Sequence, residues 1–166
     1  QLRIDMQPAS LRDILKAAIS AVVPHAEAKQ ISVVVPALDE LGQLPLIADP
    51  HRLQQVFWNL LSNAVKFTPA SGRIELQLHC DAQAYTVSVT DTGSGIEEAL
   101  LPHVFTPFTK QLKANAQGLG LGLSIARHIV ERHGGAIRVE SAGSHAGATF
   151  RVTLPVNLPP AKDAAA

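Results

Sequence analysis

The order of its helix-like and strand-like segments is the feature that most constrains the fold of this 166-residue chain. Apolar residues three and four positions apart predict helices over residues 10–24, 49–67 and 118–133. Apolar or alternating segments predict strands over residues 31–35, 73–80, 85–89, 137–140 and 149–154, with a brief further strand at 46–47. Apart from that brief strand, the order is α-β-α-β-β-α-β-β, which is not strict strand–helix alternation. It predicts an α+β fold, a two-layer α/β sandwich with helices on one face of a mixed, mostly antiparallel sheet.

Local signals mark where the predicted helices begin and end. Ser10 is suited to cap the first helix, which we expect to stop at Pro24. Asp49 followed by Pro50 is typical of a helix start and predicts the beginning of the second helix. We expect one domain over residues 1–156, followed by a linker or tail over residues 157–166 that is rich in proline and alanine.

The composition excludes several classes of function. Hydrophobic residues make up 46% of the chain and aromatic residues only 4%, so we expect a largely aliphatic core. The formal net charge is zero, and no basic stripe of the kind that binds nucleic acid is present. No apolar run approaches the roughly 20 residues of a membrane span, so no membrane contact is expected of this segment. The single cysteine, Cys80, cannot form an internal disulfide, and we interpret it as a small buried residue in a protein of a reducing compartment.

Three polar side chains form a narrow stripe on the second predicted helix. Asn59, Asn63 and Lys66 are spaced at i, i+4 and i+7, beside an apolar arc that must face the core. Amide oxygens are hard ligands suited to Mg²⁺, and an ammonium group nearby can attract phosphate. Taken alone, the same stripe is more typical of the polar rim of an ordinary helix, with Asn63 hydrogen-bonded to a neighbour.

A strand followed by two close glycines presents a carboxylate at its end. Asp91 follows residues 85–89, and Gly93 and Gly95 then permit a tight turn and close approach by a ligand. A fixed carboxylate in this position can accept a hydrogen bond from an exocyclic amine such as adenine N6. The alternative is that Asp91 is simply a turn residue.

A polar segment bracketed by Pro107 and Gly118 predicts a mobile lid, and it carries Lys110 and Lys113. The glycine run that follows leaves backbone N–H groups available for phosphate at the start of the third helix. The run comprises Gly118, Leu119, Gly120, Leu121 and Gly122. It fits neither the Walker pattern, because Leu123 replaces the required lysine, nor the dinucleotide pattern, which needs glycine there.

Taken together and in this order, these motifs resemble the catalytic ATP-binding domain of bacterial sensor histidine kinases, within the superfamily shared with gyrase, Hsp90 and MutL ATPases. The resemblance covers roughly residues 8–156. Residues 59–67 resemble the family's N box, residues 91–95 its first glycine box, residues 105–108 its F box and residues 118–122 its second glycine box. Residues 66–69 and 147–150 are also similar to family sequence, most of all to the hybrid kinases.

The resemblance implies the Bergerat-type sandwich, with ATP and Mg²⁺ bound between helices and lid. It implies that Asn63 coordinates Mg²⁺, that Asn59 and Lys66 contact phosphates or the waters of the metal, and that Asp91 binds adenine N6, joined through water by Thr149. Phe105 and Phe108 would anchor the lid. The remaining residues implied to shape the cofactor site are Gly93, Gly95, Ile96, Lys110, Gly118, Gly120, Leu121 and Gly122.

The resemblance also implies partners. A histidine kinase needs an acceptor histidine that is typically followed by an acidic residue, and none of the seven histidines here is. We therefore expect the acceptor on a separate dimerisation domain of the same parent kinase, with the receiver domain of a response regulator as a further partner. Because the chain opens at Gln1, we expect a fragment of a longer, membrane-anchored sensor; the fragment itself would be monomeric and cytoplasmic.

Two other functions of the same superfamily are open at this stage. Hydrolytic members carry a glutamate four residues before the metal-binding asparagine, where this chain has Asn59, and an amide cannot accept a proton from water. The second alternative is a non-catalytic or anti-sigma-type regulatory member that docks on, or phosphorylates serine in, a protein partner.

Overall fold

The computed structural model describes residues 2–107 and 121–156. The helices within these residues are α1 (Leu11–Ala28), α2 (Pro50–Phe67) and α3 (Gly122–Arg132), with the 3-10 turns η1 (Leu38–Glu40) and η2 (Glu98–His103). The strands are β1 (Gln7–Ser10), β2 (Ser32–Val34), β3 (Pro45–Ala48), β4 (Arg73–Cys80), β5 (Ala84–Asp91), β6 (Ala136–Glu140) and β7 (Ala148–Pro155).

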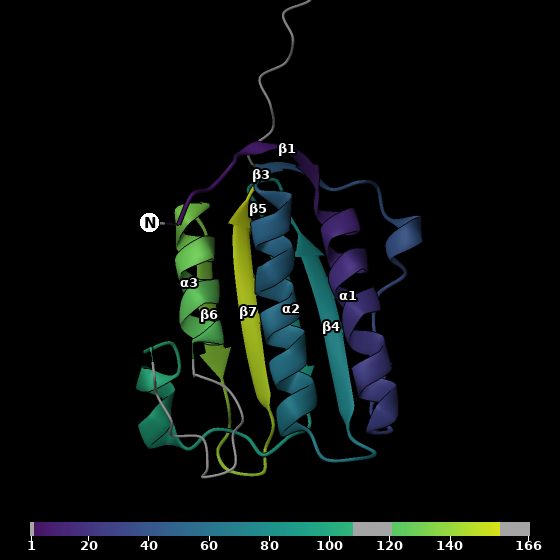
Figure 1. Ribbon diagram of the computed structural model, residues 1–166, viewed down its shortest axis with the longest axis vertical. Helices are drawn as coiled ribbons and strands as arrows, with labels where there is room; N and C mark the ends of the chain where they lie inside the picture. The colour runs from purple at the N-terminus through teal and green to yellow at the C-terminus, as the bar shows by residue number, and fades with distance from the viewer. Residues whose placement is uncertain (1, 108–120, 157–166) are drawn as a thin grey trace, which may run out of the picture.

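The main sheet has the strand order β2-β4-β5-β7-β6. Strand β2 runs parallel to β4, and the other neighbouring pairs are antiparallel. Figure 1 shows α1, α2 and α3 side by side across one face of this sheet. The expected two-layer α+β sandwich with helices on one face of a mixed sheet is therefore confirmed.

The capping signals act as predicted, but proline does not end the first helix. The Ser10 hydroxyl accepts a hydrogen bond from the N–H of Asp13, and the Asp49 carboxylate accepts one from the N–H of Arg52. Helix α1 continues through Pro24 to Ala28. A proline inside a helix removes one backbone hydrogen bond, yet Ala26 beyond it is fully buried, so packing against the core holds the last turn in helical form.

Other segments differ from expectation because contacts with distant parts of the chain determine their structure. Strand β1 pairs antiparallel with β3 as a small separate sheet beyond the ends of the helices (Figure 1), and the sequence pattern predicted only β3. The predicted third helix began at Gly118; α3 begins at Gly122, and residues 118–120 lie outside the described residues. Cys80 is exposed at the end of β4, so the expectation that it is buried was wrong.

Buried and partly exposed residues alternate along β5 and β7, and this alternation determines which side chains reach the candidate site. Tyr85, Val87 and Val89 are buried under the helices, and Asp91 is the last residue of the same buried row. On β7, Ala148 and Phe150 belong to the corresponding buried row. The sheet therefore delivers a carboxylate to the edge of the aliphatic core, directly beneath the helical layer.

Candidate nucleotide-binding site

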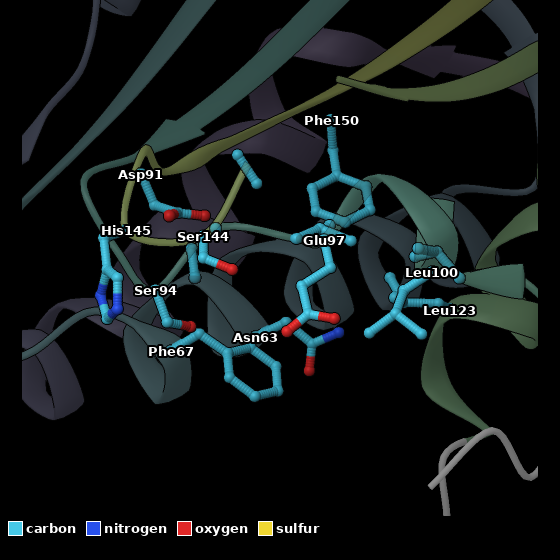
Figure 2. Close-up of a pocket in the computed structure, with 15 residues that line it drawn as sticks. Asn63, Phe67, Asp91, Ser94, Glu97, Leu100, Leu123, Ser144, His145 and Phe150 are labelled. Atoms are coloured by element: carbon cyan, nitrogen blue, oxygen red, sulfur yellow. The ribbon is translucent and has the colours of Figure 1, made fainter. Parts of the chain in front are cut away.

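A cavity of about 320 Å³ lies at the end of the core where β5 and β7 meet α2. Its lining comes from the C-terminal half of α2, the loop after β5, η2, the first turn of α3 and the loop between β6 and β7. Figure 2 shows Asp91, Ser94 and His145 on one side of this cavity and Leu100 and Leu123 on the opposite side. The size suits a drug-sized or nucleotide-sized ligand, and most of the lining is apolar.

Asp91 is the buried charged group of the cavity. Its side chain is 8% exposed, and its Oδ1 accepts a hydrogen bond of 2.8 Å from the N–H of Gly93. Burial raises the pKa of the Asp91 carboxyl above its ordinary value, and the backbone N–H groups of Gly93 and Ala148 oppose only part of that shift. The carboxylate thus has acceptor capacity left for a ligand, and an amine donor would satisfy it at the base of the cavity.

Two loops are clamped together beside Asp91, and glycine is required where they touch. Gly95 has a φ of +69°, and a Cβ atom there would lie 2.0 Å from the carbonyl oxygen of Gly143. Gly147 has a φ of +71°, and a Cβ atom there would lie 2.1 Å from the carbonyl oxygen of Asp91. The glycine motif after β5 therefore serves loop-to-loop packing as well as access for a ligand.

The polar stripe on α2 divides between three environments. Asn63 lines the cavity, as expected for a ligand-binding amide. Asn59, one turn earlier, donates a hydrogen bond of 3.0 Å from its Nδ2 to the carbonyl of Gly122 at the start of α3. Lys66 is exposed, with its ammonium group 5.5 Å from the centre of the Phe67 ring, and lines a neighbouring hollow that Phe67 also borders.

Within residues 2–107 and 121–156, the first turn of α3 shows no side-chain cap hydrogen bond. Its N-cap residue, Leu121, has no side-chain acceptor for the first helical N–H groups, whereas α1 and α2 are capped by Ser10 and Asp49. Uncapped N–H groups at a helix start are suited to bind an anion. Leu121 and Gly122 are the described part of the predicted glycine run.

The F-box aromatic Phe105 packs against the wall of the cavity. Its ring meets that of Phe150 edge to face, with centroids 6.2 Å apart, and the Arg127 guanidinium lies 5.9 Å from its centroid. Phe150 itself lines the cavity. Four predicted site residues, Phe108, Lys110, Gly118 and Gly120, lie outside the described residues.

The structure does not bring Thr149 to the cavity. Thr149 alternates with the buried residues of β7, so it lies on the helix-free face of the sheet, where its hydroxyl is 3.0 Å from that of Thr90. Ala148 is the residue of this strand beside Asp91, and it lines the cavity with Phe150. The alternation of residues 148–154 was the signal that separates Ala148 from Thr149.

Ile96, a predicted site residue, lines the cavity. Several other lining residues had no distinctive signal in the sequence, and sequence reasoning did not predict them. They come from the loop after β5, from η2 and the residue that follows it, and from the loop between β6 and β7. They are Ser94, Glu97, Leu100, Val104, Ser144 and His145. Their contribution depends on where these turns cross the core, which no local pattern encodes.

A sequence profile of the histidine kinase-, DNA gyrase B- and HSP90-like ATPases matches residues 48–158. The chain belongs to this family. The adaptive-response sensory kinase SasA of Synechococcus sp. (strain JA-3-3Ab) is 39% identical over 159 residues, covering 94% of this chain and 41% of the relative. The chain thus spans about two fifths of the length of the SasA relatives that it matches.

Solved structures give the same result for the fold. The catalytic domain of the histidine kinase ThkA matches with a TM-score of 0.80 at 27% identity, covering 93% of this chain and 99% of that domain. ThkA in complex with the response regulator TrrA matches with a TM-score of 0.75 at 26% identity, covering 93% of this chain and 42% of that one. The chain is thus a catalytic ATPase domain of the sensor histidine kinase type. None of the described helices combines the length and apolar character that crossing a bilayer demands.

Proposed function

We propose that this domain binds ATP in the cavity and supplies the γ-phosphate to a histidine on a separate acceptor domain. One observation carries the proposal: a single apolar cavity holds a buried carboxylate, Asp91, and an amide, Asn63, and reaches the first turn of α3, whose N-cap residue Leu121 makes no side-chain cap hydrogen bond. These are the groups needed for an amine-bearing base, a hydrated metal ion and a phosphate chain.

Asp91 would select the base. The exocyclic amine of adenine donates to an ionised carboxylate, whereas guanine presents a carbonyl oxygen at the corresponding position. Two acceptors facing each other in a buried site are repulsive, and each is left without a donor. The domain is therefore expected to bind ATP in preference to GTP.

Asn63 would hold Mg²⁺ together with phosphate oxygens and water. Among residues 2–107 and 121–156, no group of three or more His, Cys, Asp or Glu side chains could hold a metal ion. An amide oxygen at the cavity wall fits an ion that keeps most of its water and is carried by the nucleotide. The ion would neutralise phosphate charge, while Lys66 and the first N–H groups of α3 add fixed positive potential.

Asn59 favours phosphotransfer over hydrolysis. Its amide cannot accept a proton from water, and its Nδ2 already donates to Gly122. It would instead hold the start of α3 against α2, so that the backbone N–H groups there are in place before the phosphate chain binds. Catalysis would then consist of positioning and charge neutralisation, with the attacking nitrogen brought by the acceptor domain.

We infer that the partners are the acceptor and dimerisation domain of the same parent kinase and the receiver domain of a response regulator. The similar kinase ThkA has been solved in complex with its response regulator, which supports the second. Among the described histidines, His133 is buried and hydrogen-bonded through both ring nitrogens, which makes it unsuitable as an acceptor.

The test has two stages. Calorimetric titration with ATP, ADP and GTP, each with and without Mg²⁺, should give micromolar-range binding of both adenine nucleotides and weaker binding of GTP. Transfer of labelled γ-phosphate to the acceptor hairpin domain of a sensor kinase should then produce an acid-labile phosphohistidine. Folded protein that binds no nucleotide would support a docking module instead, and an acid-stable phosphoserine on a partner would support the anti-sigma type.

The variant Asn63→Ala should abolish transfer and the Mg²⁺ dependence of ATP binding while leaving the fold intact. Gln55→Ala is the matched control, because Gln55 lies on the same helix outside the cavity. Transfer that survives in Asn63→Ala at saturating Mg²⁺ would show that the metal ligand is assigned wrongly.

A further inference from the structure

His145 has a backbone conformation that non-glycine residues rarely adopt. Its φ is +65°, in the left-handed region that costs an ordinary residue conformational energy. The other described non-glycine residues with positive φ are Gln30, Leu44 and Ser71, and none of these lines the cavity. Strained residues that persist at a binding site point to a role for the side chain that the strain positions.

The loop that carries His145 is held rigidly against the loop of Asp91. The N–H of His145 donates to the carbonyl of Ser94 at 2.6 Å, and the N–H of Gly147 donates to that of Gly93 at 3.2 Å. The Ser141 hydroxyl accepts from the N–H of Ile96 at 3.0 Å and donates to the carbonyl of Gly147 at 2.6 Å. The two loops therefore behave as one unit, and the backbone of His145 is held in place before any ligand arrives.

The imidazole borders the Asp91 end of the cavity. Figure 2 shows the His145 ring on the same side as Asp91 and Ser94, across the cavity from Leu100 and Leu123. His145 also lines the neighbouring hollow, of about 450 Å³, that Lys66 borders. Neutral imidazole carries one hydrogen-bond donor and one acceptor. The edge of a 6-aminopurine presents both complements, an amine hydrogen and ring nitrogens.

We propose that His145 is a base-contacting residue that helps to set the affinity of the site for adenine nucleotides. The proposal rests on the proposed ATP-binding function and adds a residue to the base subsite. From the floor of the cavity, Asp91 would accept a hydrogen bond from the amine of the base. The His145 ring would contact the base from the adjoining wall. Because the loop backbone is already held in place, such a contact requires only the His145 side chain to be ordered on binding.

The variant His145→Gly removes the ring and keeps the backbone, since glycine adopts a φ of +65° without strain. We expect the dissociation constant for ADP to rise about threefold to tenfold, the range that one hydrogen bond supplies. The thermal midpoint of the free protein should not fall by more than a degree or two. His145→Gln, which retains a donor and an acceptor, should recover part of the affinity. His79→Ala removes an exposed histidine on β4 as the control.

Adenosine distinguishes a base contact from a phosphate contact made through the hollow beside Lys66. Measured by competition against a fluorescent ADP analogue, adenosine should lose the same factor as ADP in His145→Gly. A loss confined to ADP, or ADP binding within 1.5-fold of the unaltered protein, would overturn the inference alone. Folded unaltered protein that binds no ADP would overturn the proposed function and this inference with it.

Discussion

Replacing Asp91 by asparagine separates the stability of this domain from its proposed function. The carboxylate is buried, no cation is among its hydrogen-bond partners within residues 2–107 and 121–156, and burial raises its pKa. An asparagine of nearly the same shape keeps an oxygen to accept from the N–H of Gly93, 2.8 Å away. Its amide nitrogen, a donor, would then face the amine of a bound adenine, which is also a donor.

The structure sets the size of the two effects. The variant loses one hydrogen bond between a charged carboxylate and the adenine amine, and it places the donor of the asparagine amide against the donor of that amine. The binding free energy should weaken by about 1.5–3 kcal/mol, which raises the dissociation constant for ATP roughly 10- to 150-fold. The free energy of unfolding of the domain without nucleotide should not fall, although ATP binding weakens. A carboxyl whose pKa is raised on folding disfavours the folded state once it is ionised, so this penalty is present at neutral pH and is relieved as pH falls through the raised pKa. Removing the charge should therefore leave the domain as stable or more stable at pH 7.

Calorimetry with ATP and urea unfolding at pH 7 measure both effects on one sample. The control is Asp39→Asn, which removes an exposed carboxylate whose pKa Lys16 lowers, and it should leave both ATP affinity and stability nearly unchanged. In the unaltered protein, ATP affinity should fall on acidification as Asp91 takes up a proton. If Asp91→Asn binds ATP normally, or if it unfolds the domain, the role given to Asp91 is wrong.

Three further predictions follow from single contacts or from a missing group. His133→Ala should lower the free energy of unfolding by about 2–3 kcal/mol in urea titrations, because it leaves the buried N–H of Asp49 without an acceptor, whereas exposed His128→Ala should change it by less than about 0.5 kcal/mol. Gly95→Ala should abolish ATP binding and lower the thermal midpoint, since its Cβ would overlap the opposite loop; Gly42→Ala, with nothing within 4 Å, should bind normally. Turnover of ATP by the isolated domain should lie far below about one per second, and a rate at or above that value would favour a hydrolase.

The sequence predicted most helices and strands because their causes are local. Capping residues, apolar periodicity and the alternation along residues 73–80 and 85–89 act within a few positions of each other. The same local logic placed Asp91 at the end of a strand and Asn63 on the exposed edge of a buried helix. Pro24 was misleading because the cost of one missing hydrogen bond is small beside the burial of Ala26 in the last turn of α1.

Thr149 shows where local reasoning stopped. The family resemblance implied that Thr149 joins Asp91 at the base, and the pairing of β5 with β7 does bring the two strand ends together. The alternation of residues 148–154 puts Ala148 and Thr149 on opposite faces of the strand, but which residue lies opposite Asp91 depends on the register between β5 and β7. The register puts Ala148 opposite Asp91 and leaves Thr149 on the helix-free face.

By itself, the sequence determined the kind of chemistry this protein can perform: a carboxylate, an amide stripe and a glycine run, in an order that few folds accommodate. Only the tertiary structure decided which of these groups share a cavity. It buried Asp91 and so changed the pKa of its carboxyl, tied Asn59 to α3, and brought His145 to the wall beside Asp91. The reason is physical: desolvation, register and contacts between loops depend on segments far apart in the chain, and a local pattern cannot encode them.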